Sequence, residues 1–216
     1  MNTLKALLKN LLIAGLLASS LSACVPLIAG GVGTGVASTI DRRTYGEQYK
    51  DQELEVKIMR AINRKLDDKA NVSTTVFNKR VLLTGQALSE SYKAEAAKLA
   101  RETEGVASVF DEVTVGWPAT FGTGASDRLI TSSVKTRLFD PELKTVSGHH
   151  VKVVTESGIV YLMGLLGRSE ADAAVKIAST TRNVTKVVNL IEVISDEEVK
   201  RLDKKLEPSG SATSPR

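Results

Sequence analysis

The chain has 216 residues, a formal net charge of +4, one cysteine and only 4% aromatic residues. Lys5 and Lys9 belong to an N-terminal segment that we expect to be removed, which leaves 4 − 2 = +2, so the charge does not indicate nucleic-acid binding. A single cysteine excludes a disulfide within the chain, and the scarcity of aromatic residues predicts aliphatic cores.

The first 23 residues have the order of parts found in a secretory signal. Lys5 and Lys9 supply positive charge, and an apolar run over 11–18 follows them. This run is too short to span a bilayer and has no stop-transfer flank, so residues 1–23 are predicted to be a cleaved signal peptide.

The sequence Leu21-Ser22-Ala23-Cys24 resembles the lipobox of bacterial lipoproteins. The resemblance implies that the Cys24 thiol takes a diacylglyceryl group, that cleavage occurs before Cys24, and that the new amine is acylated. Two or more acyl chains anchor a protein stably, whereas one chain binds a bilayer only marginally. Val25 follows the cysteine where an Asp would imply retention in the inner membrane. The resemblance therefore implies an outer-membrane protein that faces the periplasm; the alternative is an ordinary signal peptide with a chance cysteine.

Residues 24–45 are predicted to be the lipidated cysteine and a flexible tether, because the Gly- and Ala-rich part shows no helical or strand periodicity. A first domain over 46–115 follows it. Apolar spacing and turn residues predict its elements in this order: a helix at 51–66, a hairpin of strands 71–77 and 80–86 joined by Asn78-Lys79, a helix at 89–104 and a strand at 106–115.

After a linker at 116–124, the same order repeats in a second domain at 125–195. Its predicted elements are a helix at 127–139, strands at 150–155 and 159–164, a helix at 169–181 and a strand at 184–194. The hairpin strands are antiparallel, and the crossover helix makes the last strand parallel to its neighbour. The predicted fold class is α+β, with two tandem α-β-β-α-β domains, each a three-stranded mixed sheet with two helices on one face. A charged helix and a disordered tail are expected over 196–216.

Matching positions in the two copies resemble tandem BON domains. They are the hairpin ends Val81-Leu82-Leu83-Thr84-Gly85 and Val160-Tyr161-Leu162-Met163-Gly164, and the strand starts Gly105-Val106 and Asn183-Val184. Asp41-Arg42-Arg43-Thr44 resembles the segment before the first domain of dual-BON outer-membrane lipoproteins. The resemblance implies a non-enzymatic protein that supports outer-membrane integrity and binds anionic phospholipid, such as phosphatidylglycerol, chiefly through its second domain. It also implies links with division sites and with the β-barrel assembly machinery.

A candidate binding surface emerges when Asp127 is aligned with Asp51. Leu129 then takes the place of Glu53, so a charged position of the first copy is apolar in the second. An exposed leucine among cations suits an anionic bilayer, although single exposed leucines are also common on solvated helices. Phe139 either extends this surface or covers the core. The predicted phospholipid-binding residues are Arg128, Leu129, Lys135, Arg137 and Phe139.

No pattern indicates an enzyme. His149-His150 are the only histidines, and neighbouring residues entering a strand point to opposite faces, so no metal site, catalytic residue or cofactor is predicted. The Gly-rich stretch near Gly30 has no preceding strand and fails as a phosphate loop. The rival function is an adaptor whose exposed sheet faces bind an envelope protein or peptidoglycan.

Four apolar residues outside this surface carry structural expectations. Trp117 and Phe121 in the linker are expected to be buried between the domains, with a membrane contact as the alternative. Val56 and Met59 of the first helix are expected to be domain-packing residues rather than part of a ligand site.

Overall fold

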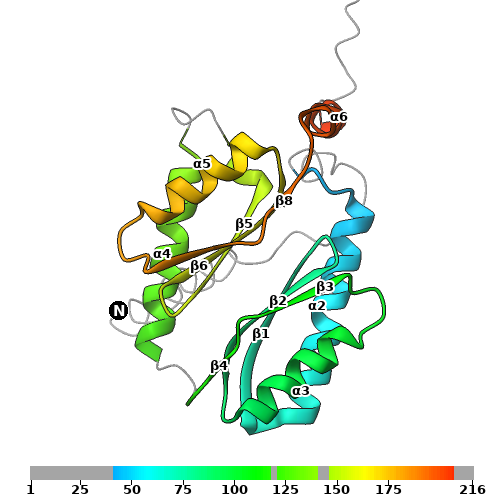
Figure 1. Cartoon of the computed structure of the whole chain (residues 1–216), viewed down its shortest axis with the longest axis vertical. Coiled ribbons are helices and arrows are strands. Elements are labelled where there is room, and N and C mark those ends of the chain that lie inside the picture. Colours follow the sequence, from blue (N-terminus) through cyan, green and yellow to red (C-terminus); the bar gives the residue numbers. More distant parts are fainter. Residues whose placement is uncertain (1–40, 118–120, 141–145, 207–216) are drawn as a thin grey trace, which may run out of the picture. The chain divides into compact units, whose positions relative to one another are not determined.

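The structure is a computed structural model that describes residues 41–117, 121–140 and 146–206. Its first domain has two helices over one face of a sheet whose strand order is β1-β2-β3 (Figure 1). The bounds are α2 Tyr45–Leu66, η2 Asp67–Lys69, β1 Ala70–Phe77, β2 Arg80–Ala87, α3 Glu90–Arg101, β3 Ser108–Asp111 and β4 Thr114–Val115. β1 is antiparallel to β2, and β3 and β4 are parallel to it, as the repeat predicts.

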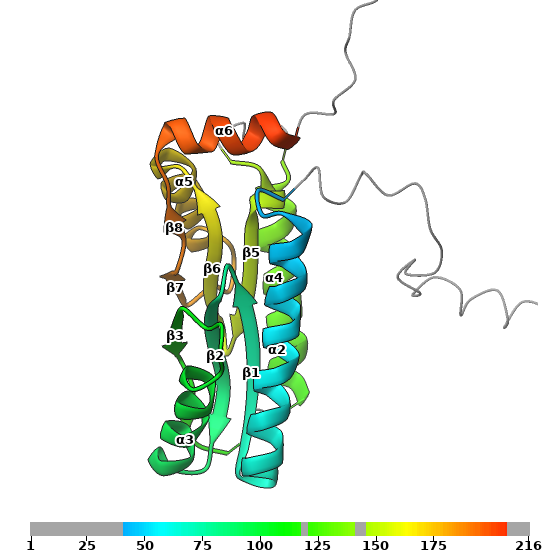
Figure 2. The same ribbon diagram turned by 90° about the vertical axis from the view of Figure 1, so that its right-hand side faces the viewer.

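The second domain repeats this arrangement, with the strand order β5-β6-β7. Its bounds are α4 Phe121–Leu138, η3 Gly148–His150, β5 Val151–Glu156, β6 Ile159–Leu166, α5 Arg168–Ser179, β7 Lys186–Asn189 and β8 Glu192–Val193, followed by α6 Asp196–Leu206. Figure 2 shows each hairpin beside its two helices. The prediction of an α+β fold built from two α-β-β-α-β units is confirmed.

The last strand of each domain is interrupted, whereas the sequence predicts it to be continuous. In the first domain the Asp111 carboxylate accepts a hydrogen bond from the Val113 N–H at 3.2 Å, and in the second the Asn189 side chain accepts one from the Ile191 N–H at 3.0 Å. These short Asp/Asn turns divide each strand into β3 and β4, or β7 and β8, although the Glu112 and Leu190 N–H groups still donate to carbonyls of the neighbouring strand at 2.9 Å.

Two glycines allow the hairpin strands to approach closely. A Cβ on Gly85 would lie 2.1 Å from the Asn71 carbonyl oxygen, and one on Gly164 would lie 2.5 Å from the His150 carbonyl oxygen. Gly85 also has a φ of +109°, which other residues rarely adopt. The glycine that ends both copies of the hairpin motif is therefore required by backbone packing.

Several helix ends differ from the expectation. Helix α2 begins six residues early because Thr44 caps it, with the Thr44 hydroxyl accepting from the Glu47 N–H and the Glu47 carboxylate accepting from the Thr44 N–H. Helix α4 begins at Phe121, within the expected linker. The expected start of α5 at Ser169 is wrong, since Gly167 is its N-cap. Helix α3 ends at Arg101, so Gly105, with a φ of +96°, lies in the turn beyond it.

Each domain has an aliphatic core between its helices and its sheet. In the first, Leu54, Ile58 and Ile62 of α2 pack on the apolar side chains that β2 directs toward the helices. In the second, Ile130, Val134 and Leu138 of α4 occupy the same place. The face of the sheets away from the helices is also covered, because β2 is buried at seven of its eight positions.

The sheet faces that point away from the helices pack against each other. They form one apolar cluster whose buried members are Phe77, Leu82, Tyr161, Met163 and Leu190. Polar contacts extend it: the Gln86 amide donates to Glu156 at 2.8 Å, and the Arg80 guanidinium donates to the Leu190 carbonyl at 3.0 Å. The expectation of exposed sheet faces for an adaptor is therefore wrong for these faces.

Arg42 fastens the segment before α2 to the second domain. Its guanidinium makes five hydrogen bonds of 2.7–3.0 Å, which reach the Leu165 carbonyl and both oxygens of Glu170 and of Asp203. The Arg42 side chain is 2% exposed. Burial by itself raises the pKa of Glu170, but the Arg42 guanidinium and the Gly167 N–H lower this pKa below its usual value. The last residues of the expected tether are thus part of the folded body.

Candidate functional site

Helix α4 is positioned by an aspartate that both domains share. The Asp127 carboxylate accepts hydrogen bonds of 2.8 Å from the N–H groups of Ser157 and Gly158 in the β5–β6 turn. Asp51 of α2 accepts the equivalent bonds from Asn78 and Lys79. Both aspartates are buried, at 8% and 3% exposure. Aligning the two copies pairs Asp51 with Asp127, but the sequence alone does not predict that they bind the hairpin turns. The signal that could have found this role is an acidic residue on the core face of the helix in both copies.

Replacing Asp127 by Ala is expected to destabilise the protein by about 2–3 kcal/mol, because two turn N–H groups lose a charged acceptor. The measurement is denaturant unfolding followed by circular dichroism. Ser126→Ala is the control, since Ser126 is exposed on the same helix. Equal stability of Asp127→Ala and the parent protein would contradict the assigned role.

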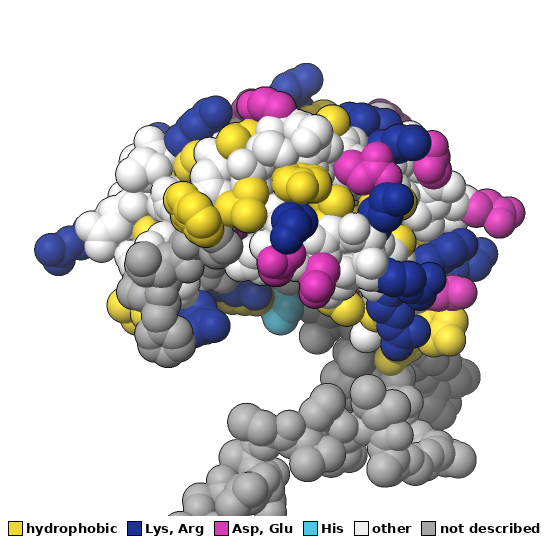
Figure 3. Space-filling view, turned by 90° about the horizontal axis from the view of Figure 1, so that it is seen from below, with side chains coloured by type: hydrophobic (Ala, Val, Ile, Leu, Met, Phe, Trp, Pro, Cys, Tyr) yellow, Lys and Arg dark blue, Asp and Glu magenta, His cyan; other side chains and the backbone are white. Residues whose placement is uncertain are grey.

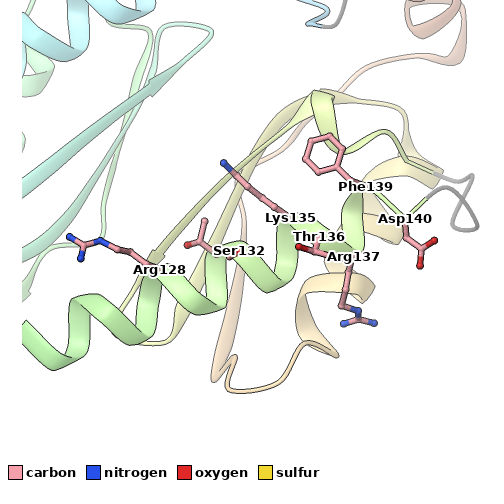
Figure 4. A pocket seen from close by; sticks show the side chains of 8 residues that line it. Arg128, Ser132, Lys135, Thr136, Arg137, Phe139 and Asp140 are labelled. Atoms are coloured by element: carbon pink, nitrogen blue, oxygen red, sulfur yellow. The ribbon is translucent and has the colours of Figure 1, made fainter. Parts of the chain in front are cut away.

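The outward face of α4 carries the residue that the sequence singled out. Leu129 is 71% exposed, and Arg128 beside it is exposed as well. Next to them is an open groove of about 880 Å³, whose lining includes Arg128, Ser132 and Lys135. Figure 4 shows Lys135 and Phe139 on one side of α4, away from Arg137.

Phe139 packs on the residues before β5 and also lines the groove. Its ring meets the His149 ring edge to face, with centroids 4.6 Å apart, and covers Gly148, where a Cβ would lie 2.9 Å from the ring. The side chain is nevertheless 45% exposed. One side of the ring therefore packs on the domain while the other adds apolar surface to the groove.

Arg137 differs from the other predicted cations because its guanidinium is bound within the domain. It donates to the Ile177 carbonyl and the Thr181 hydroxyl at 2.7 Å, and to the Thr180 hydroxyl at 3.0 Å. These bonds join the C-terminal ends of α4 and α5. Arg128 and Lys135, which have no ion pair among the described residues, are better placed to meet an external anion.

The remaining sequence expectations have mixed outcomes. Cys24, Gly30 and the signal peptide lie outside the described residues. Trp117 is 83% exposed, so the expectation of its burial between the domains is wrong; the Phe121 side chain is not described. Met59 is 40% exposed, and neither it nor Val56 belongs to a core cluster of the described residues, so the expectation that they are packing residues is not met.

The described residues also bear on metal binding and on membrane crossing. No group of three or more His, Cys, Asp or Glu side chains there could hold a metal ion. Burial and the nearby Arg42 charge lower the pKa of His150, which favours its neutral form. Within those ranges, none of the helices combines the length and apolarity needed to cross a bilayer.

Comparison with known proteins agrees with the fold and the repeat. The BON domain family matches residues 50–116 and again residues 126–195. The chain is 35% identical over 177 residues to the outer membrane lipoprotein DolP of Haemophilus influenzae, covering 81% of this chain and 90% of that protein. It is 34% identical over 158 residues to the 21 kDa hemolysin of Actinobacillus pleuropneumoniae, covering 72% and 80%.

A further relative is the osmotically-inducible protein Y of Escherichia coli, which is 33% identical over 122 residues, covering 55% of this chain and 60% of that protein. The relation to DolP over most of both chains supports an outer-membrane-associated lipoprotein. The chain therefore belongs to the BON domain family, as a DolP-like protein with two BON domains.

Proposed function

We propose that the protein is anchored to the outer membrane by lipid on Cys24 and binds anionic phospholipid through α4, in support of outer-membrane integrity. The observation that carries the binding role is Leu129, which is 71% exposed on the helix face opposite the core. Large apolar side chains in such positions are not needed for folding. The aligned residue of the first domain is the exposed Glu53, as expected for a solvated helix.

The side chains around Leu129 suit a bilayer surface. The leucine can insert between headgroups, while Arg128 and Lys135 each contribute about 1 kcal/mol near anionic lipid. Ser132 is exposed between them along the helix and lines the groove, where its hydroxyl can bond to headgroup oxygens. Phe139 adds an aromatic ring at the end of the same groove. Apolar and basic groups are thus combined on one helix face.

Anchoring makes a weak site sufficient. A protein held on the membrane by acyl chains meets lipid headgroups at high effective concentration, so the contact becomes intramolecular. The contribution of α4 is then to orient the second domain on the bilayer rather than to recruit the protein from solution.

The test is flotation of residues 38–216, without lipid, with vesicles of phosphatidylcholine alone or with added phosphatidylglycerol. Binding to the anionic vesicles is expected to weaken with salt. Leu129→Glu is expected to reduce it at least about tenfold, because the change removes apolar insertion and adds repulsion.

Val193→Glu is the matched control. It places the same charge on another exposed apolar residue of the second domain, which is 39% exposed on β8. Equal loss of binding in both variants, or binding to neither vesicle, would count against α4 as the lipid contact. Capture of an envelope protein or peptidoglycan without lipid binding would favour the adaptor function. Division-site proteins and the β-barrel assembly machinery stay predictions.

A further inference from the structure

Helix α2 of the first domain has an outward face that folding does not explain. Tyr45 and Tyr49 are 50% and 70% exposed, one turn apart at the start of the helix. Val56 and Arg60 continue the same line, because helical spacing places all four residues opposite the buried stripe. A solvated helix would carry polar residues along this line. Instead it begins with two tyrosines, which favour the boundary between water and lipid.

Tyr49, Val56 and Arg60 also line an open groove of about 590 Å³ that contains basic side chains. Lys57, Arg60 and Arg64 line this groove, and Glu53 is its only acidic residue. None of the three cations forms an ion pair with a carboxylate in the parts of the chain that the structure describes. In Figure 3 basic, acidic and apolar side chains lie together toward the right, the side on which α2 and α3 lie in Figure 1.

The position of this face along the chain favours a bilayer as its occupant. Cys24 lies 17 residues before Asp41, so the chain between them spans at most about 60 Å. Tyr45 begins the helix directly after the capping residue Thr44. The tyrosines are therefore the first exposed aromatic side chains of the folded body that follow the anchor. A basic groove behind them is complementary in charge to anionic headgroups.

We propose that the outward face of α2 is a second lipid contact, in which Tyr45 and Tyr49 lie at the headgroup level and Arg60 and Arg64 meet lipid phosphates. This contact rests on the proposed anchoring at Cys24, but it is independent of the binding assigned to α4. Each cation near an anionic surface strengthens binding about fivefold. The first domain then holds the end of the body nearest the anchor against the membrane.

The test uses the full lipidated chain in vesicles with a fluorophore on one introduced cysteine. Cys24 is the only native cysteine and is acylated in the proposal, so labelling is specific. Three labelled variants are compared: Gln52→Cys in the α2 groove, Ser132→Cys in the α4 groove and Ala94→Cys, exposed on α3. A quencher attached to phospholipid headgroups reports contact with the bilayer.

Quenching at position 52 is expected to be several-fold stronger than at position 94 in vesicles that contain phosphatidylglycerol. Adding Arg60→Glu and Arg64→Glu, both at exposed positions, is expected to remove it while position 132 stays quenched. Quenching at 132 but not at 52 would overturn the second contact and leave the proposed function standing. Quenching at neither position would overturn both, and equal quenching at 52 and 94 would overturn the second contact, because the α2 face would then be no closer to the headgroups than α3.

Discussion

Arg42→Ala is expected to lower the free energy of unfolding by about 2–4 kcal/mol. Removing one partner of a buried ion pair leaves the other charges uncompensated, which costs 3–5 kcal/mol in fully buried sites. Here Glu170 is 17% exposed and Asp203 is 45% exposed, so part of that cost is screened by water. Calorimetry should show the melting temperature falling by roughly 5–15 °C.

Arg201→Ala is the matched control, because Arg201 lies on α6 with its side chain 55% exposed and, among the described residues, forms an ion pair only with Glu198. Its effect on the free energy of unfolding should be small, because exposed ion pairs contribute little to stability. The pH dependence gives a second check. Since the pKa of Glu170 is lowered from 4.5 in the folded state, its contribution is complete above about pH 4.5 and is lost as the pH falls through the lowered pKa. The difference between Arg42→Ala and the parent should therefore shrink in acid; a constant difference would contradict the pairing.

Leu82→Ala is expected to uncouple the two domains. Leu82 is fully buried between the sheets, and truncating a buried leucine costs about 2–4 kcal/mol. The core under the helices is untouched, so each domain should keep its own fold. A single thermal transition in the parent should broaden or divide into two, and protease cleavage near Trp117 should increase, because the linker is no longer held at both ends.

Val81→Ala is the control for this change. Val81 is also fully buried, on the same strand, but its side chain faces the helices of the first domain. It should lower the stability of the first domain without increasing cleavage of the linker. If both variants behave alike, the contact between the sheets contributes no coupling of its own.

The architecture was accessible from the sequence because its signals are local. Helical spacing located Leu54 and Ile58 in the core, and Asn78-Lys79 marked a turn that requires positive φ at both residues, as found. The repeat then supplied the topology twice. Segment ends were less accessible, because the strand break at Asp111 is marked by a local hydrogen bond from the Val113 N–H to the Asp111 side chain, and such a bond leaves no periodic trace in the sequence.

Contacts between distant segments were not accessible. In the sequence, Arg42 is one of several charged residues in its segment, and nothing there predicts its partners. These partners lie on β6, α5 and α6. The same holds for Arg137, which the sequence predicts to bind phospholipid and whose guanidinium the structure bonds to the end of α5. The exposure of Leu129 could be predicted, since it depends only on the helix face. A cation's partner depends on tertiary geometry that a single sequence does not contain.

The hydrogen bonds of Arg42 also make the start of the folded body depend on residues that are synthesised much later. Asp203 follows Arg42 by 161 residues, so the guanidinium can acquire all its partners only after α6 has been synthesised. Contacts between residues so far apart form late in folding. A chain that ends before α6 would leave Arg42 with fewer acceptors at the start of the folded body. The stability of the segment before α2 therefore depends on residues near the far end of the chain.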